Sequence, residues 1–247
     1  YALTPSAATG GTFNTANYEI SYVPGALVVE KAALRIIANN DSKTYGDERT
    51  YGSGSTAFTT DGLKNSDTVG SVTLTDTNGG GVKTANAGGS YALTPSAATG
   101  GTFNTGNYEI SYVPGALVVD KAVLKIKANN DSKTFGDERV YGSGSIAFTT
   151  DGLKNSDTVG SVTLTDTNGG GVKTANAGGS YALTPSSATG GTFNTGNYEI
   201  SYVPGTLVVG KAELKITANN DSKTYGDERA YGTGSTAFTT DGLKNSD

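Results

Sequence analysis

The residues best able to bind an ion lie in one charged segment, NNDSKTYGDER, at residues 39–49. Its carboxylate oxygens are of the kind that calcium prefers, but their spacing does not match the helix-loop-helix calcium site. A solvated turn, in which Asn and Asp side chains bond nearby backbone, explains the same composition and is the favoured interpretation. The candidate calcium ligands are the acidic residues of the first two copies of this segment, Asp41, Asp47, Glu48, Asp131, Asp137 and Glu138.

A glycine-rich loop, DTNGGGVKT at residues 76–84, contains a Lys-Thr pair. A phosphate-binding loop would need that pair at a fixed spacing after the first glycine, with a helix following it. Lys83-Thr84 has the wrong spacing and no helical pattern follows. We therefore interpret this segment as a connection between strands.

The side chains that usually perform catalysis are missing. The chain has no His and no Cys, so it lacks the usual general base, disulfides, and imidazole or thiolate metal ligands. A Lys–Asn isopeptide cross-link would need a buried lysine, and the recurring lysines stand in loop-like contexts. They are Lys31, Lys43, Lys64 and Lys83. We expect no enzyme, no catalytic residue and no cofactor, with calcium as the single candidate ligand.

Aromatic residues divide into two groups. Tyr18, Tyr22 and Tyr91 stand in strand-like patterns, which predicts that they lie in the core or at its edge. Tyr45 and Tyr51 lie beside glycines and are the more exposed candidates, which would suit a surface for stacking sugars. A structural role remains the favoured interpretation for both groups.

Charge and hydropathy exclude two classes of partner. The formal net charge is −5 and charges of both signs are scattered, so no basic stripe exists for nucleic acid. No apolar run approaches the roughly 18 residues of a membrane span. We expect neither nucleic acid nor a membrane span in this segment.

The elements that position these residues repeat with a fixed period. The string YALTPS begins at Tyr1, Tyr91 and Tyr181, and residues 1–90 differ from 91–180 at eight positions. A 90-residue period exceeds the roughly 20–50 residues of solenoid repeats and fits a small domain with its own core. Asp247 matches Asp67 and Asp157, after which TVGSVTLT follows, so we expect a window on a longer array.

Adjacent strand signals place the module boundary near Lys31, Lys121 and Lys211. Residues 1–31 are then the C-terminal part of a truncated module, and 212–247 the N-terminal part of another. Residues 32–121 and 122–211 are full modules. Because the linker is short and lacks Gly-Ser runs, we expect neighbouring modules to be held semi-rigidly.

Differences between the copies indicate which face of the strand at residues 33–38 is exposed to solvent. Positions 33, 35 and 37 vary between copies, whereas Leu34, Ile36 and Ala38 do not change. A period of two is the signature of a strand, so the constant set faces the core and the varying set faces water.

The segment NYEISYVPGALVV predicts two further strands around Pro24-Gly25. We expect a turn there with a bulge or longer loop, after which the second strand returns with Leu27 and Val29 pointing inward. SVTLTD and SYALTPS predict two more strands, while AFTTDGLKNSDTVG allows a short helix or an ordered loop. The predicted fold is mainly β, a tandem array of β-grasp-like or immunoglobulin-like modules with at most one short helix each, forming an elongated rod.

Three motifs carry a family resemblance: SKTYGD, AFTTDGLKNSDTVGSVTLT and FNTGNYEISYVPGALVV. The repeat resembles the MBG domain of the YGX type, although the middle copy has Phe135 where the others have Tyr. The resemblance implies stalk repeats of secreted or cell-surface bacterial adhesins, including haemagglutinin-like exoproteins, with roles in adhesion or biofilm. It supplies no catalytic residues.

The leading hypothesis is a non-catalytic structural stalk whose partners are neighbouring modules of the same chain. One alternative is a repeated weak glycan- or surface-binding module that acts by avidity. Another is a self-associating extracellular fibre, in which the modules bind other copies of themselves.

Overall fold

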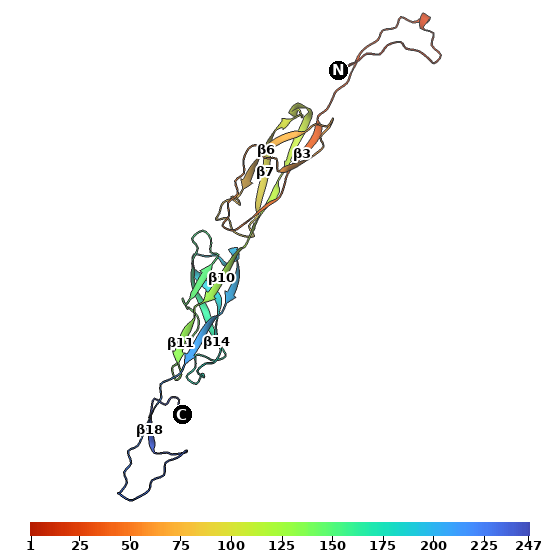
Figure 1. Ribbon diagram of the computed structural model, residues 1–247. Coiled ribbons are helices and arrows are strands. Elements are labelled where there is room, and N and C mark those ends of the chain that lie inside the picture. The colour runs from red at the N-terminus through yellow and green to blue at the C-terminus, as the bar shows by residue number, and fades with distance from the viewer. The chain divides into compact units, whose positions relative to one another are not determined.

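The computed structural model describes residues 1–247, which form two compact units (Figure 1). The first unit consists of Tyr1–Asp41, Thr50–Gly80 and Ser90–Leu117, and the second of Ser42–Arg49, Gly81–Gly89 and Val118–Asp247. Two loops of the first repeat, Ser42–Arg49 and Gly81–Gly89, therefore belong to the unit that holds the second repeat.

The second repeat folds into two sheets. A three-stranded sheet has the order β12-β10-β15, with β10 antiparallel to β12 and parallel to β15. A four-stranded sheet has the order β11-β16-β14-β13, in which only the β11–β16 pair is parallel. The elements are β10 (Ala122–Ala128), β11 (Asp131–Thr134), β12 (Phe148–Asp151), β13 (Val159–Thr167), β14 (Tyr181–Gly191), η3 (Thr195–Asn197), β15 (Tyr198–Val203) and β16 (Gly205–Gly210).

The first repeat has the same strand orders, β5-β3-β8 and β4-β9-β7-β6. Its elements are β3 (Ala32–Ala38), β4 (Asp41–Thr44), β5 (Phe58–Asp61), β6 (Val69–Thr77), β7 (Tyr91–Gly101), η2 (Thr105–Asn107), β8 (Tyr108–Val113) and β9 (Gly115–Asp120). Outside the two whole repeats lie β1 (Ala2–Leu3), η1 (Thr15–Asn17), β2 (Gly25–Ala26), β17 (Lys215–Ala218) and β18 (Phe238–Asp241). The predicted mainly β architecture of tandem modules is confirmed.

One core joins the two sheets of a repeat. Leu34 and Ile36 on β3 are fully buried and cluster with Val72 on β6, Leu93 on β7 and Leu117 on β9. The predicted alternation on β3 is therefore correct, because its constant residues are the buried ones. The varying face is exposed to solvent. On the corresponding strand of the second repeat, β10, Val123 has 65% of its surface exposed.

The Pro-Gly pair does not form the predicted hairpin. β8 pairs with β3 in the three-stranded sheet, whereas β9 pairs with β7 in the other, so Pro114 and Gly115 form a corner between sheets. Proline has no N–H to offer a ladder, which suits a point where pairing ends. A Cβ on Gly115 would lie 2.6 Å from the carbonyl oxygens of Ala38 and Asn39, so only glycine fits this corner.

The ambiguous segment at residues 57–70 contains an ordered loop and no helix. After β5 ends at Asp61, the chain turns, and the Asp67 amide donates to the Lys64 carbonyl at 2.8 Å. Asn65 and Ser66 have positive φ, which ends any helical run. The helices of the chain are single 3₁₀ turns capped by Asn14, Asn104 and Asn194, and none has the length or apolar character that a membrane span requires.

A single residue, Lys121, separates the last strand of the first repeat from the first strand of the second, since β9 ends at Asp120 and β10 begins at Ala122.

The predicted core positions are buried only where a whole repeat is present. Tyr108 is 3% exposed, whereas the corresponding Tyr18 is 64% exposed.

Candidate functional site

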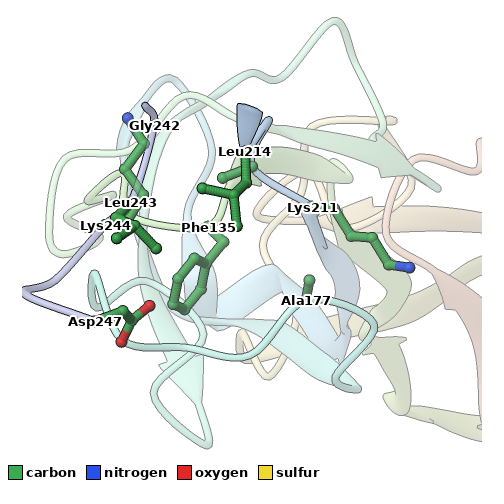
Figure 2. Close-up of a pocket in the computed structure, with 9 residues that line it drawn as sticks. Phe135, Ala177, Lys211, Leu214, Gly242, Leu243, Lys244 and Asp247 are labelled. Atoms are coloured by element: carbon green, nitrogen blue, oxygen red, sulfur yellow. The ribbon is translucent and has the colours of Figure 1, made fainter. Parts of the chain in front are cut away.

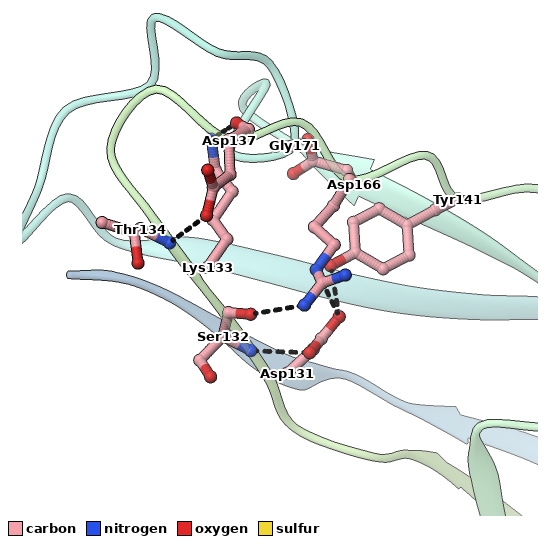
Figure 3. A network of polar contacts seen from close by, with 9 residues as sticks. Asp131, Ser132, Lys133, Thr134, Asp137, Tyr141, Asp166 and Gly171 are labelled. Carbon is pink, nitrogen blue, oxygen red and sulfur yellow. Dashed lines mark hydrogen bonds and ion pairs between the residues drawn. The ribbon is translucent and has the colours of Figure 1, made fainter. Parts of the chain in front are cut away.

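The charged segment predicted as a calcium site forms its own network of bonds. In the second repeat (Figure 3), the Asp131 carboxylate accepts hydrogen bonds from the Ser132 amide at 2.7 Å and the Tyr141 hydroxyl at 2.9 Å, and it pairs with Arg139 at 3.9 Å. Burial, followed by the bond to Asp131, raises the pKa of the Tyr141 phenol. The carboxylate therefore acts as an acceptor for neighbouring protein groups.

The other calcium candidates point to separate partners. Asp137 accepts from the Thr134 amide at 3.4 Å, and Glu48 pairs with Lys83 at 3.7 Å. Asp41 accepts from the Tyr51 hydroxyl at 3.0 Å. The chain brings no three acidic side chains together with metal-site geometry. Calcium binding stays a prediction for these residues.

A lysine in this segment is buried, contrary to its predicted loop context. Lys43 is 4% exposed, and its ammonium donates to the carbonyls of Asp47 at 3.0 Å and Val82 at 2.7 Å. Both of these acceptors are backbone carbonyls, whereas an isopeptide bond requires an Asn side chain. Lys133 repeats the arrangement with Asp137 and Val172.

The glycine-rich loop binds a carboxylate of its own repeat. Asp166 accepts from the Gly170 amide at 2.9 Å and from the Gly171 amide at 2.5 Å. Tyr181 packs on the same loop, because a Cβ on Gly170 would lie 2.6 Å from the Tyr181 Cβ. The amides that would bind a phosphate thus donate to a carboxylate of the same repeat. This supports the interpretation of the glycine-rich loop as a connection between strands.

Tyr45 lies in the interior, so the prediction that it is an exposed residue for stacking sugars is wrong. It is 5% exposed within the second unit. Tyr51 is half-buried and donates to Asp41. Adjacent glycines suggested exposure for both residues, but the surface that covers Tyr45 comes from a distant part of the sequence.

Tyr45 packs against an aromatic residue of the second repeat. Its ring meets the Tyr198 ring edge-on, with centroids 5.4 Å apart and an interplanar angle of 78°. The Tyr45 hydroxyl donates to Asp157 Oδ2 at 3.0 Å, and the Tyr198 hydroxyl donates to the same oxygen at 2.6 Å. The Lys154 amide donates to the Tyr198 hydroxyl at 2.9 Å. The geometry combines edge-to-face packing with charge-assisted hydrogen bonds.

The residue after Tyr45 must be glycine. Gly46 has a φ of +93°, and a Cβ there would lie 2.7 Å from Cγ and 2.8 Å from Cβ of Lys154. The turn is closed by the Asp47 amide, which donates to the Thr44 carbonyl at 3.0 Å. We call Tyr45, Gly46 and Asp47 the tip.

Polar groups beside the tip add contacts to a neighbouring loop. Asn155 Nδ2 donates to the Lys83 carbonyl at 2.9 Å, and the Ala87 amide donates to Asn197 Oδ1 at 2.9 Å. Asn197 is only 2% exposed, and its amide nitrogen also bonds Asn86. We call the receiving residues the socket, and they are Lys154, Asn155, Asp157, Asn197 and Tyr198.

Burial, followed by the hydrogen bond to Asp157, raises the pKa of the Tyr198 phenol above its usual value. Asp157 Oδ2 accepts hydrogen bonds from the hydroxyls of Tyr198 and Tyr45. The site therefore joins side chains of two repeats through ring packing and hydrogen bonds.

A related arrangement surrounds Phe135, which lines a cavity together with Lys244 and Asp247 (Figure 2). Gly136 has a φ of +93° and lies against the Lys244 side chain, and Asn245 Nδ2 donates to the Lys173 carbonyl at 3.1 Å. A cavity of about 260 Å³ remains beside Phe135, lined in part by Leu214 and Asp247. Phe135 is half-buried beside this cavity.

Both whole repeats match a known protein family. The sequence profile of the MBG domain (YGX type) matches residues 34–118 and 124–208, well over half of the chain. The chain belongs to the MBG domain family. No curated protein matches it. The matched ranges fall inside the predicted modules 32–121 and 122–211.

The YGX designation of the MBG family matches the Tyr-Gly pair that forms the tip here. In this MBG chain the aromatic ring fills a socket, and the glycine permits both the turn and the contact with Lys154. Sequence reasoning missed this role, although one signal was present. Phe135 keeps the ring of Tyr45 and loses its hydroxyl, which is the substitution expected of a packing residue.

Proposed function

We propose that this chain is a stretch of non-catalytic spacer modules from the stalk of a large extracellular bacterial adhesin or biofilm-matrix protein. The proposal rests mainly on one observation, the burial of Tyr45 against Tyr198 and Asp157 of the following repeat. The Tyr-Gly pair of one repeat contacts the following repeat of the same chain. Contacts of this kind would join successive modules of a stalk.

The pattern of variation between copies supports the same proposal. Val123, Val140 and Ile146 replace smaller residues of the first repeat, and all of them are exposed. The core is kept and the tip keeps its aromatic ring, while the surface changes. Such a pattern suits modules in which fold and continuity matter more than a ligand-binding face.

The test asks whether the modules contribute only their length. In the parent adhesin, residues 32–211 are deleted, and separately replaced by an unrelated rigid spacer of equal length. We expect deletion to reduce cell attachment and the spacer to restore it. Attachment that the spacer fails to restore would instead indicate a binding role for the modules.

The glycan-binding alternative has its own readout. The intact chain is applied to a glycan array, with Tyr51→Ala as the variant that removes the remaining half-buried aromatic candidate. The stalk proposal expects no saturable binding by either protein. Saturable binding that Tyr51→Ala weakens would favour the avidity hypothesis.

A further inference from the structure

Each whole repeat has one Asn-Gly pair, at the start of its glycine-rich loop. The pairs are Asn78-Gly79 and Asn168-Gly169. Asparagine is a thermolabile residue, and glycine has no Cβ to shield the backbone nitrogen that follows the side-chain amide. These two residue types are therefore well suited to an intramolecular reaction between the amide carbon and that nitrogen.

The pair in the second repeat is exposed and unconstrained. Asn168 and Gly169 have φ of +75° and +69°, so the chain makes a left-handed turn directly after β13. The Gly169 amide donates no hydrogen bond, unlike the two amides that follow it. A Cβ on Gly169 would meet no atom within 4 Å. The turn therefore has room to bring the Gly169 nitrogen against Asn168 Cγ.

The pair in the first repeat has the same geometry. Asn78 and Gly79 are exposed, with φ of +74° and +70°, and a Cβ on Gly79 would also meet no atom within 4 Å. The two repeats thus provide matched copies of one reactive turn.

Other asparagines of the second unit are held by bonds or precede larger residues. Asn155 Nδ2 donates to a backbone carbonyl at 2.9 Å, and Asn197 Oδ1 accepts from a backbone amide at 2.9 Å. Asn176 is exposed in the same connection between β13 and β14, but it precedes Ala177. Asn168 alone among these combines an exposed side chain with a following glycine.

We propose that Asn168, and Asn78 in the first repeat, deamidate spontaneously and convert in part to isoaspartate. The Gly169 nitrogen gives its proton to hydroxide and forms a bond to Asn168 Cγ. The Cγ–Nδ2 bond breaks, and the leaving nitrogen takes a proton from water and departs as ammonia. Water then opens the cyclic imide. Addition at Cγ yields aspartate, whereas addition at the main-chain carbonyl yields isoaspartate, whose backbone passes through the side chain and gains one methylene.

An isoaspartate at position 168 would disturb the bonds that follow it. Asp166 accepts from the Gly170 amide at 2.9 Å and from the Gly171 amide at 2.5 Å, and the Arg139 amide donates to the Gly171 carbonyl at 2.9 Å. Both glycines are closely packed, since an added Cβ would lie 2.6 Å from the Tyr181 Cβ or 2.4 Å from the Arg139 carbonyl oxygen. Because the added methylene has no space here, it should break these bonds and loosen the loop.

The same loop holds the turn at Phe135. The Lys173 carbonyl accepts from the Gly136 amide at 3.2 Å, and the Val172 carbonyl accepts from the buried Lys133 ammonium. Deamidation at one exposed asparagine therefore acts on the segment that carries the aromatic-glycine pair of the same repeat. Since each whole repeat has its own reactive turn, the fraction of altered modules should rise with the age of the chain.

Ageing of the intact chain tests the proposal. The chain is incubated in warm, mildly alkaline ¹⁸O-water, returned to ordinary water and cleaved after glutamate. Fragments 49–109 and 139–199 each contain one site, and they differ at positions 50 and 140, so mass spectrometry distinguishes them. We expect both fragments to exchange an amide for an acid that carries one ¹⁸O, at positions 78 and 168, and isoaspartate methyltransferase to methylate them. No product at position 168, or equal product at Asn155 and Asn176, would overturn the proposal.

Two variants isolate the reacting groups. Asn168→Gly removes the amide and keeps a residue that readily adopts a positive φ. It should abolish the product at position 168 and leave that at Asn78 unchanged. Gly169→Ala places a methyl group beside the attacking nitrogen, in open space, and should slow the reaction at position 168 by roughly tenfold. An unchanged rate in Gly169→Ala would contradict attack by that nitrogen.

Hydrogen exchange measures the loosening of the loop. Protection of the Gly170, Gly171 and Arg139 amides should fall in the aged parent chain and persist in aged Asn168→Gly. Asn168→Asp carries the charge of the product without the added methylene, so it should also retain protection. Full protection in the deamidated parent chain, or an equal loss in fresh Asn168→Asp, would overturn the assignment of the loosening to the methylene.

The reaction requires no enzyme and no partner, and it goes beyond the stalk proposal without depending on it. A chain that does not deamidate leaves the spacer-replacement experiment able to support or contradict the stalk proposal. A failed spacer replacement likewise leaves the ageing measurement intact.

Discussion

Tyr45 and Tyr198 meet edge to face at 5.4 Å, and both hydroxyls donate to one oxygen of Asp157. The pair joins side chains that are far apart in sequence and belong to different repeats. Tyr198 begins β15, and Asp157 lies in the turn before β13, so the contact anchors two elements of the second repeat to the tip.

Removing the buried ring should destabilise the second unit. Tyr45→Ala deletes an aromatic side chain that is 5% exposed, and we expect a loss of about 2–4 kcal/mol in the free energy of unfolding. Hydrogen exchange of the β10 amides measures that loss for the second repeat by itself. The matched control is Tyr225→Ala, at an exposed copy of the same position, which should leave those amides unchanged. Equal effects of the two substitutions would contradict the assignment of Tyr45 as the packed residue.

The glycine of the tip offers a second matched pair. Gly46→Ala combines strain at a positive φ with a clash against Lys154, whereas Gly226→Ala meets no atom within 4 Å and carries only the strain. We expect Gly46→Ala to cost about 1–3 kcal/mol of stability in the second unit. Urea denaturation measures both variants. A Gly46→Ala protein as stable as the parent would show that the tip is not held against Lys154.

The sequence predicted β3 well because its signal is local. Leu34, Ile36 and Ala38 alternate with positions that vary between copies, and burial follows that period of two. The tip could not be placed in the same way. Its covering surface begins more than a hundred residues later in the chain, beyond the reach of any local pattern.

The prediction for the Pro-Gly pair was wrong for a related reason. Pro114-Gly115 has the composition of a turn, and a turn was expected to return the strand to its neighbour. The strand instead changes sheets, because β8 finds a parallel partner in β3, far earlier in the chain. Local residues specify that the direction changes, while the long-range pairing decides which strand comes next to it.

Alkaline pH should weaken the second unit. Burial and the bond to Asp157 raise the pKa of Tyr198 above the usual value of a tyrosine phenol, so folding favours the neutral phenol. Its contribution to stability is complete below the unfolded value and is lost as pH rises through the folded value. Absorbance titration of tyrosinate should show a late-ionising phenol that Tyr198→Phe removes. An identical titration curve for the variant would contradict the raised pKa.

The Tyr45 hydroxyl should contribute less to the stability of the second unit than the Tyr45 ring does. Tyr45→Phe removes the bond to Asp157 and keeps the packing, and Asp157 retains its bond from Tyr198, so no buried acceptor is left unpaired. We expect a cost of about 1 kcal/mol, smaller than that of Tyr45→Ala. Phe135 shows that a copy of the tip without the hydroxyl is tolerated in this chain.

A double-mutant cycle isolates that hydrogen bond. Tyr45→Phe, Asp157→Asn and their combination are compared by urea denaturation, and we expect a coupling of about 0.5–1.5 kcal/mol between the two sites. The control cycle pairs Asp157→Asn with Tyr225→Phe, whose hydroxyl lies in solvent and should show no coupling. Additive effects in the first cycle would mean that the ring alone, without its hydroxyl, holds the tip in the socket.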